Sequence, residues 1–248
     1  MSPFVPPVAE LPEAAFLVER FAAVGRKRGY VILLPELWGI VPQIRGVAAR
    51  FAAEGFEVFV PDLLPGVLAP TADREAIVAR LAAADDRLAM KKIALVVERI
   101  RAAEPAGPTV VAGFCYGGRM AIHAAAHVKV EGIISFYGSY GTTSAKALDP
   151  RRSALDADVP VQAHYGADDA SIPPADVEFA RAALRFGRVF SYPEAGHAFM
   201  NETRESFRPA AAREAWSRVL DFLSEREQSW SLAHPVPAEP AWDLVEDA

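Results

Sequence analysis

The sequence is poor in cysteine and in long apolar runs. One cysteine, Cys115, occurs in 248 residues, so the chain can form no internal disulfide and nothing points to an oxidising compartment. The longest apolar runs, such as residues 30–35, have the length of a strand, far below the roughly 20 residues of a membrane-spanning helix. The first residues lack the pattern of a signal peptide, a basic stretch before an apolar core. We therefore expect a cytoplasmic protein without a membrane partner.

An excess of basic residues is also missing. Lys and Arg number 26 against 32 Asp and Glu, a net charge of −6, which argues against a protein that binds duplex nucleic acid. Apolar residues make up 52% of the chain, enough for a large buried core, and the length suits one α/β domain. We expect small-molecule partners and a monomer or homodimer.

Short runs of β-forming residues alternate with helical patterns along the chain. The run at 30–34 does not alternate between apolar and polar residues, which is typical of a strand buried on both faces of a parallel sheet. Alternating strands and helices predict a three-layer α/β fold with a mostly parallel central sheet. The expected strands are 16–21, 30–34, 56–60, 109–112, 132–136, 161–165 and 189–192; the expected helices are 44–54, one that starts at about 71–75, 88–103, 119–127, 175–185 and 209–225.

One domain is expected to span residues 1–226. The remaining residues, 227–248, contain three prolines and two tryptophans, Trp230 and Trp242. This composition is unlike a second domain, and we expect a tail that lies over the body of the protein or over a neighbour.

The single cysteine lies in the motif Gly113-x-Cys115-x-Gly117, between an expected strand and an expected helix. In this setting the chain makes a strained turn in which only small residues fit two positions before and after the nucleophile. The turn lifts the side chain clear of the sheet, and the N-terminus of the following helix favours a thiolate. The amide of Tyr116 can donate to an oxyanion. Most lone cysteines are small buried apolar residues, but the flanking strand and helix favour a nucleophile.

Two later loops carry the residue types that complete such a site. Asp168 and Asp169 follow the strand at 161–165, and His197 follows the strand at 189–192. Nucleophile, acid and histidine in this order are typical of the α/β-hydrolase fold. A lone loop histidine is often only a surface residue, but this order favours a general base, and either aspartate can orient its imidazole.

Glu36 follows the strand at 30–34 almost at once, at the sheet edge where open α/β sheets place their sites. A carboxylate there is costly unless it is solvated or paired, so one interpretation is that Glu36 faces Cys115. The alternative is an acid that caps a helix or loop. The next residues, 37–39, would form a loop that supplies a second oxyanion donor.

Five segments occur in a fixed order along the chain. They are Pro35-Glu36-Leu37-Trp38-Gly39, Val60-Pro61-Asp62-Leu63, Gly113-Phe114-Cys115-Tyr116-Gly117-Gly118, Gly166-x-x-Asp169-x-x-Ile172-Pro173 and Tyr192-x-Glu194-Ala195-Gly196-His197-x-Phe199. Together they resemble the dienelactone hydrolase (carboxymethylenebutenolidase-like) family of the α/β-hydrolase fold, over roughly residues 30–225. The resemblance implies an enzyme that hydrolyses a lactone or activated carboxylic ester through a thioester acyl-enzyme, without a cofactor.

The resemblance also implies a catalytic triad of Cys115, His197 and Asp169. It selects Asp169 over Asp168, because the family's acid stands three residues after the glycine at the strand end. In the family a glutamate that matches Glu36 interacts with the thiol and helps to activate it.

Further roles follow from the same resemblance. The backbone amides that match Leu37 and Tyr116 form the oxyanion hole. Family members hold a substrate carboxylate with arginines, one of them four residues after the histidine, and in this sequence that position is Asn201. Trp38, Asn201 and Arg204 are the residues expected to contact the substrate.

Several other functions fit the sequence less well. A cysteine phosphatase needs an arginine six residues after the cysteine, where this chain has Ala121. His123 and His127 have an i,i+4 spacing that can bind a metal, but no third ligand is evident, so no metal site is expected. A glutaminase-like enzyme would leave the loops of Asp169 and His197 unexplained. The main alternative is an α/β-hydrolase-like scaffold that binds a small ligand without catalysis.

Overall fold

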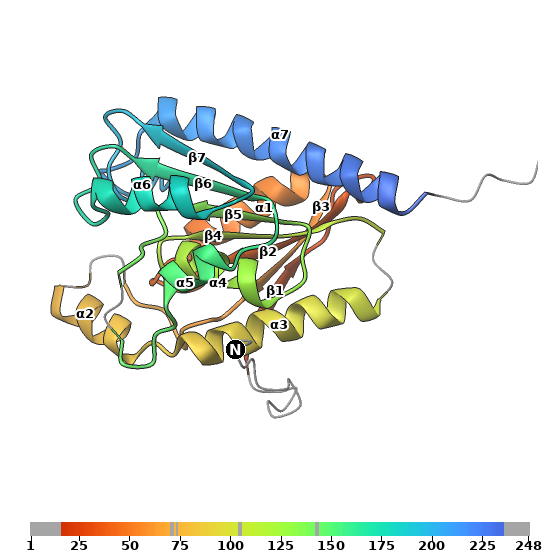
Figure 1. Cartoon of the computed structure of the whole chain (residues 1–248). Coiled ribbons are helices and arrows are strands. Elements are labelled where there is room, and N and C mark those ends of the chain that lie inside the picture. Colours follow the sequence, from red (N-terminus) through yellow and green to blue (C-terminus); the bar gives the residue numbers. More distant parts are fainter. Residues whose placement is uncertain (1–15, 70–71, 73, 104–105, 142–143, 236–248) are drawn as a thin grey trace, which may run out of the picture.

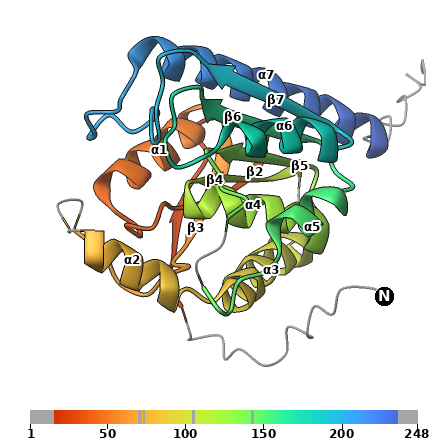
Figure 2. The same ribbon diagram turned by 60° about the vertical axis from the view of Figure 1, so that its left-hand side comes forward.

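A computed structural model of the chain shows a seven-stranded sheet between two layers of helices (Figures 1 and 2). It describes residues 16–69, 72, 74–103, 106–141 and 144–235. The strand order is β1-β3-β2-β4-β5-β6-β7. Only the edge pair is antiparallel, β1 (Val18–Phe21) with β3 (Phe56–Pro61), and every other neighbour in the sheet is parallel. This architecture confirms the predicted three-layer α/β class with a mostly parallel sheet.

Four strands at the centre of the sheet are buried along their whole length, as the sequence predicts for the apolar run at 30–34. They are β2 (Gly29–Leu34), β4 (Thr109–Phe114), β5 (Gly132–Phe136) and β6 (Val161–Gly166), and β7 (Gly187–Tyr192) completes the sheet. Because these strands run parallel, their carboxyl ends meet at one edge of the sheet. The segments that follow β2, β4, β5, β6 and β7 therefore gather there.

Seven helices are seen in the described part of the chain. They are α1 (Pro42–Ala53), α2 (Arg74–Ala83), α3 (Asp86–Ala102), α4 (Tyr116–His127), α5 (Pro150–Leu155), α6 (Pro174–Ala183) and α7 (Pro209–Ala233). Helices α1 and α7 cover one face of the sheet, and α3, α4, α5 and α6 lie on the other side (Figures 1 and 2). None of the described helices is both long and apolar enough to cross a membrane.

Two helices differ from the sequence expectations. The pattern does not predict α5, which has only six residues and begins with Pro150, its start capped by the carboxylate of Asp149. Helix α7 continues to Ala233, so the first residues of the expected tail are helical, while residues 236–248 lie outside the described residues. The expected start of α2 near residue 71 also falls partly outside them.

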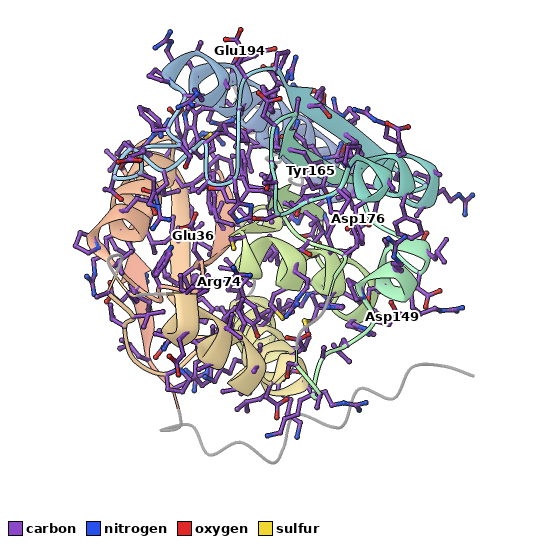
Figure 3. The ribbon with its side chains drawn as sticks, turned by 90° about the vertical axis from the view of Figure 1, so that its left-hand side faces the viewer. Glu36, Arg74, Asp149, Tyr165, Asp176 and Glu194 are labelled. Carbon is purple, nitrogen blue, oxygen red and sulfur yellow. The ribbon has the colours of Figure 1, made fainter. Side chains whose placement is uncertain are left out.

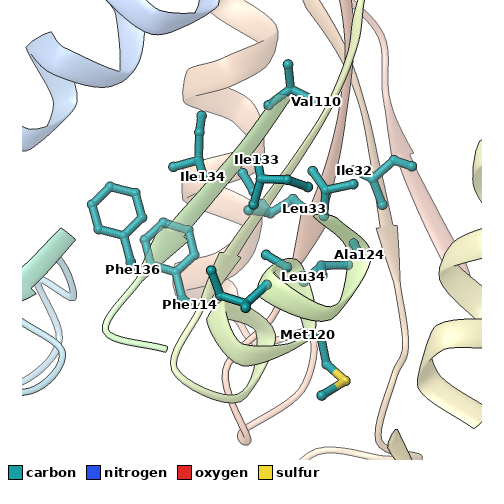
Figure 4. Packing of buried hydrophobic residues seen from close by; sticks show 14 of the residues in the cluster. Ile32, Leu33, Leu34, Val110, Phe114, Met120, Ala124, Ile133, Ile134 and Phe136 are labelled. Carbon is teal, nitrogen blue, oxygen red and sulfur yellow. The ribbon is translucent and has the colours of Figure 1, made fainter. Parts of the chain in front are cut away.

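The core packs where β2, β4 and β5 meet α4 (Figure 4). Ile32, Leu33 and Leu34 are fully buried, and the rings of Phe114 and Phe136 stack with centroids 4.7 Å apart. Each large apolar side chain buried in this way contributes about 1.5–3 kcal/mol to folding. The result is a rigid platform directly beneath the carboxyl edge of the sheet.

Candidate active site

Cys115 lies at the turn between β4 and α4 with a strained backbone. Its φ is 53° and its ψ −113°, a conformation that costs a non-glycine residue on the order of 1–3 kcal/mol. A Cβ on Gly113 would lie 2.1 Å from the carbonyl oxygen of Gly117, and a Cβ on Gly117 would lie 2.3 Å from that of Leu34. The amide of Cys115 donates to the carbonyl of Phe136 at 3.0 Å. The turn therefore has the tight geometry that its sequence predicts.

Three side chains from three loops form a row at this edge. His197 Nε2 lies 3.2 Å from Cys115 Sγ, and His197 Nδ1 lies 2.8 Å from Asp169 Oδ2. The backbone amide of Ser171 donates to the other oxygen of Asp169 at 2.8 Å, which fixes the carboxylate. The side chain of Asp169 is fully buried, whereas Asp168 is exposed. The structure thus brings Asp169, and not its neighbour, against the imidazole.

The charge of His197 is set by its two neighbours. Burial lowers the pKa of His197, but the Cys115 sulfur and the hydrogen bond to Asp169 outweigh burial, so that its pKa lies well above the ordinary 6.5. The imidazole thus lies between the sulfur and the carboxylate, both of which favour its protonated form. The ring of Tyr137 packs on the imidazole with centroids 5.0 Å apart, which holds its plane.

Glu36 lies buried behind this row, with 3% of its surface exposed. The hydroxyl of Tyr137 donates to Glu36 Oε1 at 3.1 Å, and the amide of Asn201 donates to Oε2 at 3.3 Å. Burial raises the pKa of Glu36, an effect opposed by the positive His197 and by these hydrogen bonds. The hydrogen-bond partners of the carboxylate are Tyr137 and Asn201, and the interaction with the thiol that the resemblance implies stays a prediction. Glu36 is labelled in Figure 3, which views the protein from the side of α2.

A cavity of about 560 Å³ opens beside Cys115 and His197. Trp38 and Arg204 both line it, and the guanidinium of Arg204 lies 5.0 Å above the Trp38 ring. Asn201, the third residue expected to contact substrate, is buried and is not part of the lining that the described residues form. Its side chain instead binds Glu36 and accepts from the hydroxyl of Thr203 at 2.7 Å.

The loop that carries Leu37 is fixed by Arg80 of α2. Arg80 Nε donates to the carbonyl of Leu37 at 2.6 Å, and Arg80 Nη2 donates to those of Leu64 and Gly66 at 2.9 and 2.7 Å. The expected oxyanion donors, the amides of Leu37 and Tyr116, belong to residues on the cavity wall. The sequence reading missed Arg80, because its carbonyl partners leave no residue-type signal.

Tyr137 is a second residue that the sequence reading missed. It is fully buried, has a φ of 40°, and contacts both Glu36 and His197. A usable signal existed, because Tyr137 directly follows the strand at 132–136 and so belongs to the same sheet edge.

A separate buried polar cluster surrounds Asp86 at the start of α3. Asp86 Oδ1 accepts from the hydroxyl of Tyr116 at 3.2 Å and from Arg119 Nη2 at 3.0 Å. His123 Nδ1 lies 2.8 Å from the hydroxyl of Ser153, and its Nε2 lies 3.9 Å from Asp86 Oδ2. Burial, with a smaller effect of Arg119, lowers the pKa of His123 to about 3. His123 is thus a neutral residue of the core.

Comparison with known proteins identifies the family. A model of the dienelactone hydrolase family matches residues 14–226. The chain belongs to this family. A carboxymethylenebutenolidase of Rhodococcus opacus is 32% identical over 203 residues, which cover 78% of this chain and 79% of that protein. A Salmonella typhimurium protein provisionally named carboxymethylenebutenolidase is 31% identical over 206 residues, covering 79% and 76%.

The solved structures agree with the family. A Klebsiella pneumoniae protein provisionally assigned as a dienelactone hydrolase superposes with a TM-score of 0.73 at 27% identity, covering 85% of this chain and 99% of that one. This similarity confirms the predicted α/β-hydrolase fold. Together with the carboxymethylenebutenolidases, it confirms that the dienelactone hydrolase-like chain is a hydrolase.

Proposed function

We propose that this dienelactone hydrolase-like protein hydrolyses a lactone or an activated carboxylic ester with Cys115 as the nucleophile. In this proposal His197 is the general acid and base, and Asp169 orients it. The carrying observation is the row of two short contacts, 3.2 Å from sulfur to imidazole and 2.8 Å from imidazole to carboxylate, beside an open cavity. Nucleophile, base and orienting acid in such contact are the geometric signature of covalent catalysis.

The first half of the cycle forms a thioester. The sulfur of Cys115, as a thiolate paired with protonated His197, attacks the carbonyl carbon, and the carbonyl electron pair moves onto oxygen. The amides of Leu37 and Tyr116 stabilise this oxyanion. The tetrahedral intermediate then collapses, the bond to the leaving oxygen breaks, and His197 protonates that oxygen.

The second half of the cycle restores the enzyme. Neutral His197 accepts a proton from water as the water oxygen attacks the thioester. The carbon–sulfur bond breaks, the acid product leaves, and the thiolate again pairs with the imidazolium. An enolate or phenolate leaves with little protonation, so we expect activated esters and enol-lactones to be hydrolysed and amides to resist.

Glu36 is proposed to support the charge on His197. The positive imidazolium lowers the pKa of Glu36 against the larger effect of burial, and by the same interaction a carboxylate at Glu36 stabilises the imidazolium. Tyr137 and Asn201 hold the carboxylate in place. Glu36 therefore contributes to thiolate formation through His197.

The decisive experiment is alkylation of the only cysteine. The protein is treated briefly with iodoacetamide at a series of pH values, and the mass of the intact chain and the hydrolysis of p-nitrophenyl acetate are followed together. We expect alkylation at pH values below the roughly 8.5 of an ordinary thiol, with activity lost in step with the mass change. His197→Gln should slow alkylation at pH 6, whereas His234→Gln, an exposed histidine beyond α7, is the matched control.

Two results would contradict the proposal. One is an alkylated protein that keeps its esterase activity. The other is a thiol that stays inert below pH 8 while hydrolysis proceeds. Either result would show that hydrolysis does not use Cys115. An inert thiol in a protein that hydrolyses none of the esters would favour the alternative, a scaffold that binds a small ligand without catalysis.

A further inference from the structure

Helix α2 forms one wall of the cavity although none of its residues, all of them described, is buried. Ile77 and Leu81 lie one helical turn apart, so both point to the same side, and both line the cavity. They remain half-exposed, while Val78 on another side of the helix is 52% exposed. Arg80 binds the helix to four backbone carbonyls. Ile77 and Leu81 thus pack in part against the core and present the rest of their apolar surface to the cavity.

The remaining apolar wall belongs to the loop after β2. Leu37 and Trp38 of this loop line the same cavity, and both are themselves packed into the protein. The cavity therefore has hydrocarbon on α2 and an indole and a leucine on the loop. Apolar surface of this kind gains about 25 cal/mol for each Å² that a ligand removes from water.

The two tyrosine hydroxyls in the lining are directed to protein partners. The hydroxyl of Tyr116 donates to Asp86, and that of Tyr137 donates to Glu36. A ligand that hydrogen-bonds to either hydroxyl must displace a buried carboxylate, which is costly. The two tyrosines thus have little to offer a polar ligand group.

The two arginines of the lining are also engaged. Arg119 donates to Asp86 and to the carbonyl of Gly141. Arg204 stacks on Trp38, and its charge acts on Glu36, whose pKa it lowers. A carboxylate entering this cavity would lose its hydration and compete with carboxylates already in place.

We propose that the substrate is an uncharged ester or lactone with a hydrocarbon group, alkyl or aryl, that packs against Ile77 and Leu81 on α2 and Trp38 of the loop after β2. This inference rests on the proposed function and names the substrate class of the same site. The hydrocarbon group covers the part of Ile77 and Leu81 that the core leaves exposed, while the reacting carbonyl lies at Cys115.

The test uses two pairs of esters that differ in charge but hardly in shape. One pair varies the acyl group, p-nitrophenyl isocaproate against p-nitrophenyl hydrogen succinate. The other varies the alcohol, para-isopropylphenyl acetate against para-carboxyphenyl acetate. Each kcat/KM is divided by the alkaline hydrolysis rate of the same ester, which removes differences in intrinsic reactivity. We expect the neutral ester to be favoured about tenfold or more in at least one pair.

Variants of α2 then locate the hydrocarbon group. The double variant Ile77→Ser with Leu81→Ser should reduce the neutral-over-charged ratio severalfold, because two apolar contacts are lost. Val78→Ser, the same kind of change on the same helix but away from the cavity, should leave the ratio unchanged. Since none of these side chains is buried, the fold is preserved, which circular dichroism verifies.

The outcomes separate the two proposals. Cys115-dependent hydrolysis that favours the charged ester in either pair, shows no preference in both, or keeps its ratio in the double variant overturns the substrate class alone. Absence of Cys115-dependent hydrolysis with every ester overturns the proposed function and the inference with it.

Discussion

The surroundings of His197 and of His123 contain the same kinds of residue in different arrangements. His197 lies between a thiol and a carboxylate, 3.2 Å from Cys115 Sγ and 2.8 Å from Asp169 Oδ2. Its side chain is 29% exposed and lines a cavity. These contacts raise its pKa well above 6.5.

His123 likewise lies near a nucleophile-type side chain and a carboxylate, here the hydroxyl of Ser153 and the carboxylate of Asp86. The carboxylate is 3.9 Å from the imidazole, beyond hydrogen-bonding distance, and its oxygens accept instead from Tyr116, Arg119 and a backbone amide. The side chain is fully buried, and burial lowers its pKa to about 3. The comparison teaches that an aspartate near a histidine makes a base only when the carboxylate faces the imidazole and the imidazole faces a cavity.

The largest expected effect comes from removing the two nucleophile-type side chains in turn. Cys115→Ala should lower kcat/KM for p-nitrophenyl acetate by roughly a thousandfold or more. Ser153→Ala should leave the activity unchanged, because Ser153 is buried away from the cavity, and should lower the free energy of unfolding by about 1 kcal/mol. Initial rates give kcat/KM, and urea unfolding gives the free energy of unfolding. If Cys115→Ala were as active as the unaltered chain, the surroundings of His197 would be no more catalytic than those of His123.

The orienting acid sharpens the comparison further. Asp169→Asn keeps the size of the side chain but removes the charge that holds the His197 imidazolium, and we expect kcat to fall by roughly a hundredfold to ten-thousandfold. Asp168→Asn is the matched control, since Asp168 is the exposed neighbour, and its kcat should stay within about twofold. Similar losses in both variants would assign the effect to the loop rather than to the carboxylate.

Asp86 should contribute to the free energy of unfolding through the buried polar cluster around it. Asp86→Asn leaves the buried guanidinium of Arg119 without its ion-pair partner, and we expect the free energy of unfolding to fall by about 3 kcal/mol. Urea unfolding followed by circular dichroism gives the value. Asp149→Asn, at the exposed start of α5, should cost less than about 1 kcal/mol. The opposite order of the two losses would show that the Asp86 cluster contributes little.

The smallest expected effect is a pH dependence of stability from His123. Its pKa is about 3 when folded against about 6.5 when unfolded, so the neutral imidazole stabilises the fold above pH 6.5. This contribution is lost as the pH falls, by about 1.4 kcal/mol for each pH unit. His123→Gln should therefore lose less stability than the unaltered chain between pH 7 and pH 5, by up to about 2 kcal/mol. Identical pH slopes in urea unfolding would contradict a buried neutral His123.

The sequence predicts the sheet well because its strands are short runs of β-forming residues that alternate with helical patterns. Residues 30–34 and 132–136 became strands β2 and β5 nearly residue for residue. Helix α5 escaped prediction because six residues carry too little periodicity. The end of α7 was missed because the tail's prolines begin only at Pro235, after the helix has ended.

Within the site, chain order alone places the loops of Cys115, Asp169 and His197 together, since parallel strands end at one edge. Order cannot determine hydrogen-bond partners. Glu36 binds Tyr137 and Asn201, a choice made by side-chain directions in the folded protein. The wall formed by α2 was not predicted, because the residue pattern indicates where this helix begins but not which of its side chains meet the cavity.

The crowded turn at Cys115 has a mechanical consequence. A Cβ on Gly117 would strike the backbone of Leu34 and Pro35, and a Cβ on Gly118 would strike the carbonyl of Phe136. The ends of β2 and β5 thus pack directly against the turn that follows β4, with no free space between them. A change of one methyl group there would push the loop of Glu36 on one side and Tyr137 on the other, so its damage spreads across the whole site at once.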